Sequence, residues 1–233
     1  MSEPLITQVT HHPFPLLRAF KNTLDVFLLT KEDDIQNDQD VQKATGCTKT
    51  ASLHQIHGDR MVIAREPMER GADADGLLTD TLDLLLSIRT ADCQPILVYA
   101  PEKNVIGLMH VGWKGLVART IPSFFKTLKE EWNVDPQDSY VCIGPSMRQC
   151  CAEYREEDHL LREFDESFWK GTYVDLAGIA DQQLLNLGVQ QDRIECHADC
   201  TCCHPKTYWT YRGGDRQKVQ EGHTNVLAAR LRD

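Results

Sequence analysis

Three short segments of the sequence combine glycine with histidine or cysteine, a pattern that ordinary strands and helices do not require. They are LHQIHG at residues 53–58, RTADCQP at residues 89–95 and HVGWKG at residues 110–115. Two imidazoles and a thiolate suit zinc or copper, and three protein ligands leave one tetrahedral position open to water or substrate. We therefore take His57, Cys93 and His110 as candidate catalytic residues and ligands of a metal, zinc or alternatively copper.

Each candidate ligand also has a purely structural interpretation. The three residues do not form a compact CxxC or HExxH pattern, so their spacing alone does not decide for a metal. His54 competes with His57, but only His57 is followed by a glycine, which permits close approach of the backbone. Cys93 could be an inert core thiol, whereas the flanking Asp92 and Pro95 favour a turn that exposes its sulfur.

Several polar side chains near these segments are candidates for substrate binding. The loop at residues 112–115 runs into a predicted helix, whose free N–H groups could bind a phosphate or carboxylate together with a nearby lysine. The alternative is a plain glycine turn with a buried tryptophan. Cations in such positions are often simply solvated. The candidate substrate-binding residues are Gln55, Asp75, Arg89, Lys114 and Arg212.

A second group of cysteines lies toward the end of the sequence. It comprises Cys196, Cys200, Cys202, Cys203 and His204, with Cys150 and Cys151 earlier in the chain. Adjacent cysteines take the place of the paired CxxC knuckles that are typical of structural zinc sites. The spacing therefore does not predict a second metal, and these thiols could oxidise or bind soft metals incidentally.

The elements that must position these residues are mostly short apolar runs. β-like runs occur at residues 26–29, 61–64, 82–88, 96–99, 105–110 and 140–143. Several are apolar throughout, which predicts a sheet covered on both faces. The runs at 96–99 and 105–110 form a hairpin-like unit, and its open end would bring Cys93 and His110 together.

Helical periodicity appears later in the chain. Residues 116–132 carry apolar side chains at three- and four-residue steps, and Pro122 either kinks this helix or marks its start after Thr120. A second helix begins after Asp175 and ends before Gly188, and residues 156–164 could form a third. The polar run at 31–49 predicts a surface connection or a short exposed helix. We expect one mixed α/β (α+β) domain over residues 1–233, with central mixed sheet layers flanked by helices.

Composition limits the classes of function. The chain has 233 residues, 41% of them hydrophobic, and a net charge of −10, which argues against nucleic acid as a partner. No apolar run approaches the length of a membrane span and the first residues lack the features of a signal peptide, so we expect a cytoplasmic protein. Nine cysteines, an odd number, favour thiols over disulfides. The oligomeric state, monomer or homodimer, is not readable from the sequence.

The ordered set of motifs resembles the laccase-domain family, also called multicopper polyphenol oxidoreductases or YfiH-type proteins. Residues 53–58 resemble the family's QVHG element, 71–80 its ADALVTD, 89–95 its TADCxP and 110–115 its HAGWRG. Residues 143–154 resemble IGPxIGxCCYEV, 174–189 the helix DLxxANxxQLxxxGV, 200–201 the CT pair and 208–214 the segment FFSYRRD. Eight ordered matches are far more specific than any single motif.

The resemblance implies a mixed α/β fold with zinc on His57, Cys93 and His110. It also implies phosphorolysis of adenosine, inosine and methylthioadenosine, with purine nucleosides and phosphate as binding partners, and deamination of adenosine as a second activity. Lys114 stands where the family has Arg, Trp209 and Thr210 replace Phe and Ser, and residues 222–224 replace a GR step, all in the expected substrate region. These departures weaken the substrate assignment more than the metal assignment.

Three other functions remain open at this point. A copper-dependent polyphenol oxidase fits the family's older name, but nine scattered histidines do not suggest several copper sites. A cysteine hydrolase or amidase, for example in editing peptidoglycan precursors, would use Cys93 as nucleophile and a histidine as base. A binding protein without catalysis would hold no metal and turn over no nucleoside.

Overall fold

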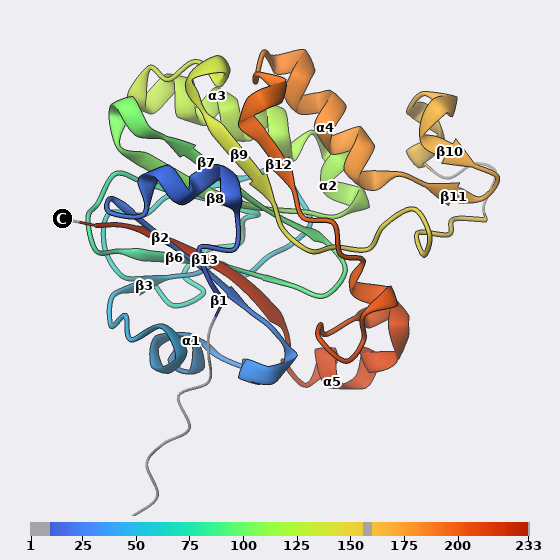
Figure 1. Ribbon diagram of the computed structural model, residues 1–233, viewed down its shortest axis with the longest axis horizontal. Helices are drawn as coiled ribbons and strands as arrows, with labels where there is room; N and C mark the ends of the chain where they lie inside the picture. The colour runs from blue at the N-terminus through green and yellow to red at the C-terminus, as the bar shows by residue number, and fades with distance from the viewer. Residues whose placement is uncertain (1–9, 156–159, 233) are drawn as a thin grey trace, which may run out of the picture.

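The computed structural model describes residues 10–155 and 160–232, which build layered sheets with helices outside (Figure 1). Within these residues, a five-stranded sheet has the order β1-β2-β13-β6-β3 and a six-stranded sheet the order β12-β9-β7-β8-β5-β4. The first sheet comprises β1 (Thr10–His11), β2 (Leu24–Leu29), β13 (Asn225–Leu231), β6 (Leu85–Thr90) and β3 (Thr50–Ala51). The second comprises β12 (Ile194–Cys196), β9 (Tyr140–Ile143), β7 (Gln94–Ala100), β8 (Val105–Val111), β5 (Gly76–Thr79) and β4 (Met61–Ile63). A separate hairpin pairs β10 (Trp169–Lys170) with β11 (Tyr173–Val174).

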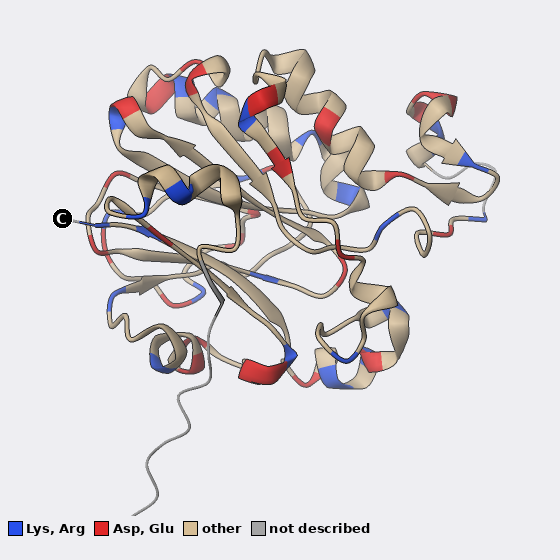
Figure 2. Ribbon diagram, viewed as in Figure 1, with Lys and Arg blue, Asp and Glu red and all other residues tan. Residues whose placement is uncertain are grey.

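The two large sheets share a hydrophobic core because their strands are apolar on both faces. In β7, Leu97 and Tyr99 belong to the core between the sheets, whereas Ile96 and Val98 belong to the core beneath the helices. Strands β6, β7, β8 and β13 bring the two sheets into contact. Charged residues lie mostly in helices and loops rather than strands (Figure 2). The predicted sheet covered on both faces is therefore confirmed, as two packed sheets.

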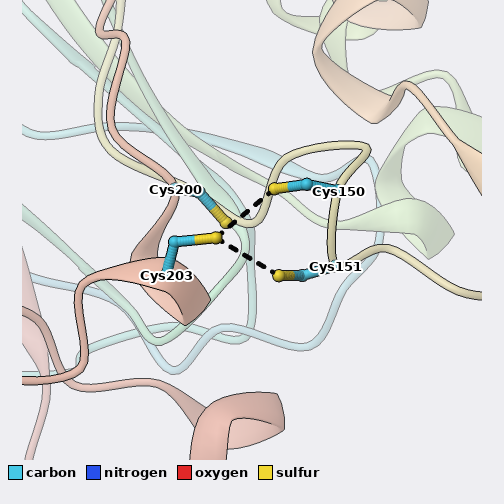
Figure 3. Close-up of side chains that lie close together, drawn as sticks. All are labelled: Cys150, Cys151, Cys200 and Cys203. Carbon is cyan, nitrogen blue, oxygen red and sulfur yellow. Dashed lines mark hydrogen bonds between the residues drawn. The ribbon is translucent and has the colours of Figure 1, made fainter.

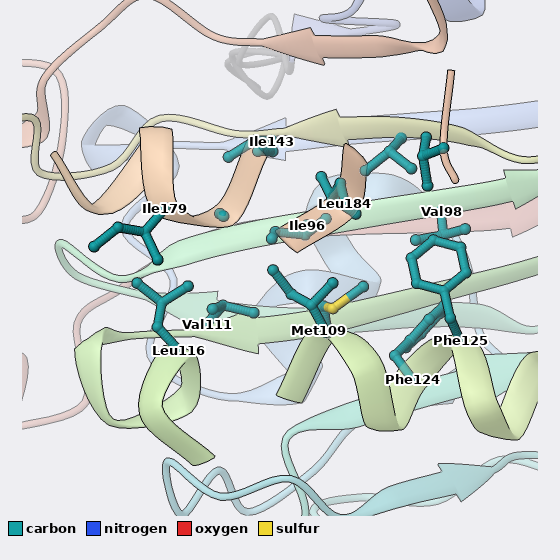
Figure 4. Packing of buried hydrophobic residues seen from close by; sticks show 14 of the residues in the cluster. Ile96, Val98, Met109, Val111, Leu116, Phe124, Phe125, Ile143, Ile179 and Leu184 are labelled. Atoms are coloured by element: carbon teal, nitrogen blue, oxygen red, sulfur yellow. The ribbon is translucent and has the colours of Figure 1, made fainter. Parts of the chain in front are cut away.

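Helices cover the outer face of each sheet. Helices α2 (Trp113–Ala118), α3 (Thr120–Trp132) and α4 (Leu176–Leu187) bury apolar side chains against the six-stranded sheet (Figure 4). Phe124 of α3 lies directly on Gly107 of β8, where an added Cβ would lie 2.4 Å from the ring. Helix α1 (Asp38–Thr45) packs Val41 against the five-stranded sheet, and α5 (Arg216–Gln220) is the last helix before β13 in the chain. The mixed α/β fold predicted from the sequence is confirmed.

Individual elements differ from the predictions where the backbone takes unusual conformations. The expected helix at 116–132 is two helices, because Arg119 adopts a left-handed conformation with φ 64°. Helix α3 begins at Thr120, so Pro122 lies in its first turn, where proline is tolerated. The strand expected at 82–88 runs from Leu85 to Thr90 instead.

Helix α4 is confirmed with both predicted end residues. The Asp175 side chain accepts the Gly178 N–H at 2.9 Å, and Gly188 ends the helix with φ 101°. Of the helix expected at 156–164, residues 156–159 lie outside the described residues, and Leu160–Glu163 form a single 3-10 turn. The polar run at 31–49, expected to be a surface connection or a short exposed helix, contains the short helix α1, in which only Asp38 and Val41 are buried.

Candidate metal centre and substrate cavity

His57, Cys93 and His110 converge from three separate segments. His57 lies in the loop between β3 and β4, Cys93 in the connection that crosses from β6 to β7, and His110 near the end of β8. Their ligand atoms all lie within 4.8 Å of one another, and the Cys93 Sγ is 4.0 Å from the His57 Nε2. Sulfur and nitrogen ligands of one tetrahedral zinc stand about 3.6 Å apart, as follows from zinc–ligand bond lengths. The donor set and its spacing therefore fit a zinc ion.

Asp75 holds two of these residues in place from beneath. One carboxylate oxygen accepts the His57 N–H at 2.9 Å and lies 2.8 Å from the His110 Nδ1. The other accepts the N–H groups of Ile56 at 3.2 Å and Gly58 at 2.6 Å. Burial opposes the charge, but the hydrogen bonds from His110 and these backbone groups lower the pKa of Asp75. A carboxylate on the Nδ1 of a ligating histidine fixes the ring so that Nε2 faces the metal.

The electrostatics of the site favour a thiolate. Burial opposes ionisation of Cys93, but the neighbouring His110 and His57 outweigh it and lower the Cys93 pKa to about 6. Burial likewise disfavours a charged His110, yet Cys93 and Asp75 raise its pKa to about 9. Cysteine and histidine bind metals in their deprotonated forms. A metal cation among Cys93, His57 and His110 would therefore take the place of the proton that they hold without it.

Local backbone geometry brings the three candidate ligands together. His57 has φ 63° and Asp92 has φ 90°, two of the left-handed positions that non-glycine residues rarely occupy. Gly112 leaves room for both neighbours, because a Cβ there would lie 2.7 Å from the Cys93 Sγ and 3.4 Å from His57. The glycine of HVGWKG is thus explained by close packing against the ligands.

A cavity of about 690 Å³ is lined by the three candidate ligands. Volumes of about 300–1,000 Å³ are typical of small-molecule sites. Four of the five predicted substrate-binding residues line it, and Asp75 does not. Its other lining residues include Arg70, Trp113, Met147, Tyr211 and His223.

Two of the predicted substrate-binding residues are occupied by contacts within the protein. The Gln55 amide donates to the Arg89 carbonyl at 2.7 Å and accepts the Arg89 N–H at 2.9 Å. The Arg89 guanidinium donates to the Gln36 carbonyl at 2.7 Å and pairs with the buried Asp38 at 2.8 Å. Its Nε has no hydrogen-bond partner among the described residues. Asp38 thus neutralises much of the charge that Arg89 would offer an anion.

The other two cations are more accessible. Lys114 is exposed, and its Nζ lies 5.6 Å from the centre of the Trp113 ring. Arg212 is exposed, donates to the Glu153 carbonyl at 3.0 Å and lies 5.4 Å from the Tyr154 ring centre. Helix α2 begins at Trp113, within the segment predicted as a loop, and has only six residues, so its dipole adds little to anion binding.

Comparison with known proteins places these features in a family. Residues 30–229 match the family model described as multi-copper polyphenol oxidoreductase laccase. The chain belongs to this family. A purine nucleoside phosphorylase of Clostridium acetobutylicum is 29% identical over 184 residues, which cover 76% of each chain. Purine nucleoside phosphorylase YlmD of Geobacillus stearothermophilus is 29% identical over 179 residues, 68% of this chain and 65% of that one.

Solved structures show the same fold. The crystal structure of the Geobacillus stearothermophilus YlmD superposes with a TM-score of 0.80 at 23% identity, covering 100% of this chain and 98% of that one. The Bacillus licheniformis hypothetical protein YfiH gives a TM-score of 0.77 at 22% identity, covering 90% and 93%. The predicted resemblance to the laccase family is confirmed.

Among the described residues, no helix is both long and apolar enough to cross a bilayer.

Reasoning from the sequence missed the role of Asp92 in this laccase-family site. One of its carboxylate oxygens accepts the hydroxyls of Thr201 and Thr210, both at 2.7 Å, and the other accepts the Arg212 N–H at 2.7 Å. Asp92 therefore ties the segment that carries Tyr211 and Arg212 to the loop that carries Cys93. Its partners lie more than 100 residues away in the chain, so only its place beside Cys93 pointed to it.

Proposed function

We propose that the protein is a zinc-dependent purine nucleoside phosphorylase that acts on adenosine, inosine and methylthioadenosine and also deaminates adenosine. The observation that carries the proposal is the convergence of His57, Cys93 and His110 under a cavity with accessible cations on its wall. Relatives that share 29% of their aligned residues with this chain are named purine nucleoside phosphorylases. Purine nucleosides and phosphate would then be its ligands.

In this proposal His57, Cys93 and His110 hold the metal. When bound, zinc supplies a Lewis acid at the floor of the cavity. Asp75 acts as a positioning residue rather than a substrate contact, because both of its oxygens already accept hydrogen bonds from the ligand loop and His110. Gln55 has a similar part, since its amide pairs with the Arg89 backbone and holds the His57 loop against β6.

The cavity wall would bind the two substrates through different chemistry. Lys114 and Arg212 can hold phosphate as cations, and Arg89 adds a partly neutralised third charge. Trp113, Met147 and Tyr211 offer apolar and aromatic surface for a purine. The protein would then orient phosphate toward the C1′ of the ribose, which is the positioning that a bimolecular displacement requires.

Product analysis with and without phosphate tests the proposal. Inosine should release hypoxanthine and ribose 1-phosphate only when phosphate is present, and adenosine should in addition release ammonia. Lys114→Met should raise the KM for phosphate about tenfold or more, while Lys114→Arg, which keeps the charge, should raise it much less. Wild-type protein that contains its metal but forms no phosphate-dependent product would refute the phosphorylase.

One observation favours a second candidate, a cysteine hydrolase or amidase. Cys93 has a pKa of about 6, and its Sγ lies 4.0 Å from the His57 Nε2, an arrangement that also suits a nucleophile with a base. Metal content separates the two: metal-free protein that hydrolyses an amide and is inactivated by alkylation of Cys93 would support the hydrolase.

Oxidation of a phenol such as syringaldazine, measured with zinc and then copper, tests the polyphenol oxidase of the family's name.

A further inference from the structure

Four cysteines outside the candidate active site point toward one another (Figure 3). Cys150 and Cys151 lie in a tight turn after β9, whereas Cys200 directly precedes, and Cys203 ends, the 3-10 turn Thr201–Cys203 after β12. The four sulfur atoms all lie within 4.8 Å of one another. The Cys203 Sγ is 3.5 Å from the Sγ atoms of both Cys150 and Cys151. Cysteines separated by about 50 residues therefore form one compact cluster.

The spacing of the sulfurs suits a single metal ion. With zinc–sulfur bonds of about 2.3 Å, the edges of a tetrahedral site are about 3.8 Å long. The distances of 3.5 Å within the cluster lie close to that edge and are much longer than a disulfide bond of about 2.05 Å. Cys200 and Cys203 also have CxxC spacing, whereas the adjacent Cys150 and Cys151 replace the second knuckle.

The surrounding backbone holds the two segments in register. Ser146 and Cys200 form a parallel bridge, and the Thr201 N–H donates to the Ser146 carbonyl at 3.1 Å. The Arg148 N–H donates to the Cys200 Sγ at 3.4 Å, an interaction that stabilises a metal-bound thiolate. Cys200 is buried, while Cys150 and Cys203 are exposed, which gives an ion a route into the cluster.

We propose that Cys150, Cys151, Cys200 and Cys203 bind one zinc ion through four thiolates, as a structural site separate from the candidate catalytic metal. Four protein ligands leave no open position, which is typical of structural rather than catalytic zinc. The site would fasten the segment that begins at Cys200 to the turn after β9. Thr201 and Thr210 of that segment donate their hydroxyls to Asp92 beside Cys93, so the ion would brace one wall of the cavity.

Zinc content of full-length variants tests this site independently of activity. Cys93→Ser removes a ligand of the first site, and we expect this variant, purified with reductant, to retain one zinc per chain. Adding Cys150→Ser and Cys203→Ser should abolish that zinc. Cys196→Ser is the matched control, because Cys196 is exposed and lies on β12 but its sulfur accepts a hydrogen bond from Arg148 instead of joining the cluster. It should leave the zinc content unchanged.

Two further measurements decide the outcome even if the double cysteine replacement does not fold. Cobalt added to metal-free Cys93→Ser protein should give the intense thiolate-to-metal absorption of a tetrathiolate site, with one equivalent at saturation. Alkylation of unfolded wild-type protein without reductant should modify all nine cysteines, which the structure shows as free thiols. Cys93→Ser protein without zinc and without this absorption would overturn the proposal. Peptide mapping that finds Cys150, Cys151, Cys200 or Cys203 unmodified would do the same, because it would show a disulfide in the cluster.

Discussion

Replacement of Asp75 by asparagine probes the support of the metal ligands without altering any ligand. The carboxylate accepts four hydrogen bonds, two at each oxygen, and asparagine has only one oxygen. If that oxygen stays with His57 and His110, the NH₂ group faces the N–H groups of Ile56 and Gly58. Two donors then lose their acceptor, at about 1–3 kcal/mol each, or about 2–6 kcal/mol together.

These magnitudes predict two measurable effects. Because the bonds to Ile56 and Gly58 are only partly buried, we expect the lower half of that range and a Tm lower by roughly 5–10 °C. His110 also loses its charged partner, and changes of this kind lower metal affinity about 10–100-fold. Zinc affinity is measured by competition with a chromophoric chelator, and Tm by differential scanning calorimetry of the metal-free protein.

Asp73 provides the matched control in the same motif. Its carboxylate is exposed and pairs with the exposed His54 at 2.8 Å, so Asp73→Asn should change stability by less than about 0.5 kcal/mol and leave zinc affinity unaltered. Equal zinc affinity and Tm in Asp75→Asn and wild type would refute the positioning role of Asp75. An equal loss in both variants would show that general negative charge, rather than the hydrogen bonds, supports the site.

Three other substitutions follow from close contacts. Gly112→Ala would place a Cβ 2.7 Å from the Cys93 Sγ, about 1 Å closer than ordinary van der Waals contact. We expect zinc affinity to fall at least about tenfold. Unchanged zinc affinity would contradict the packing argument. Gly107→Ala would press on the Phe124 ring and should lower the free energy of unfolding in urea by about 1–3 kcal/mol without changing zinc affinity. Thr210→Val removes one hydrogen bond to Asp92 and should lower the free energy of unfolding in urea by about 1–3 kcal/mol. Thr127→Val is the control and should lower it less, because the Thr127 hydroxyl bonds only to a carbonyl of its own helix.

Local pattern predicted much of the fold, because continuous apolar runs mark the buried strands and three- and four-residue steps mark the helices. The ends of α4 were predictable from Asp175 and Gly188, since both act on the adjacent backbone. The break between α2 and α3 was not, because it depends on the left-handed conformation of Arg119, a residue type that does not favour it. The division of the strands into two sheets was also unpredicted, because an apolar strand does not specify which neighbour it pairs with.

In the candidate site, too, local motifs were predictable from the sequence and contacts between distant residues were not. His57, Cys93 and His110 could be selected from the sequence, because each lies in a short segment where a histidine or cysteine stands within a few positions of a glycine or proline. Arg89 is different: its ion pair with Asp38 joins residues 51 positions apart, so the sequence alone presented it as a free cation.

The sequence by itself therefore determined the apolar strands, the capped helix and the three residues that we propose as metal ligands. The tertiary structure alone decided that Asp75 and Asp92 position the ligands and the cavity wall, and that four distant cysteines meet in one cluster. The physical reason is that periodicity and capping act between residues a few positions apart. Hydrogen bonds and thiol contacts across more than 30 residues exist only once distant strands have paired and the two sheets have packed.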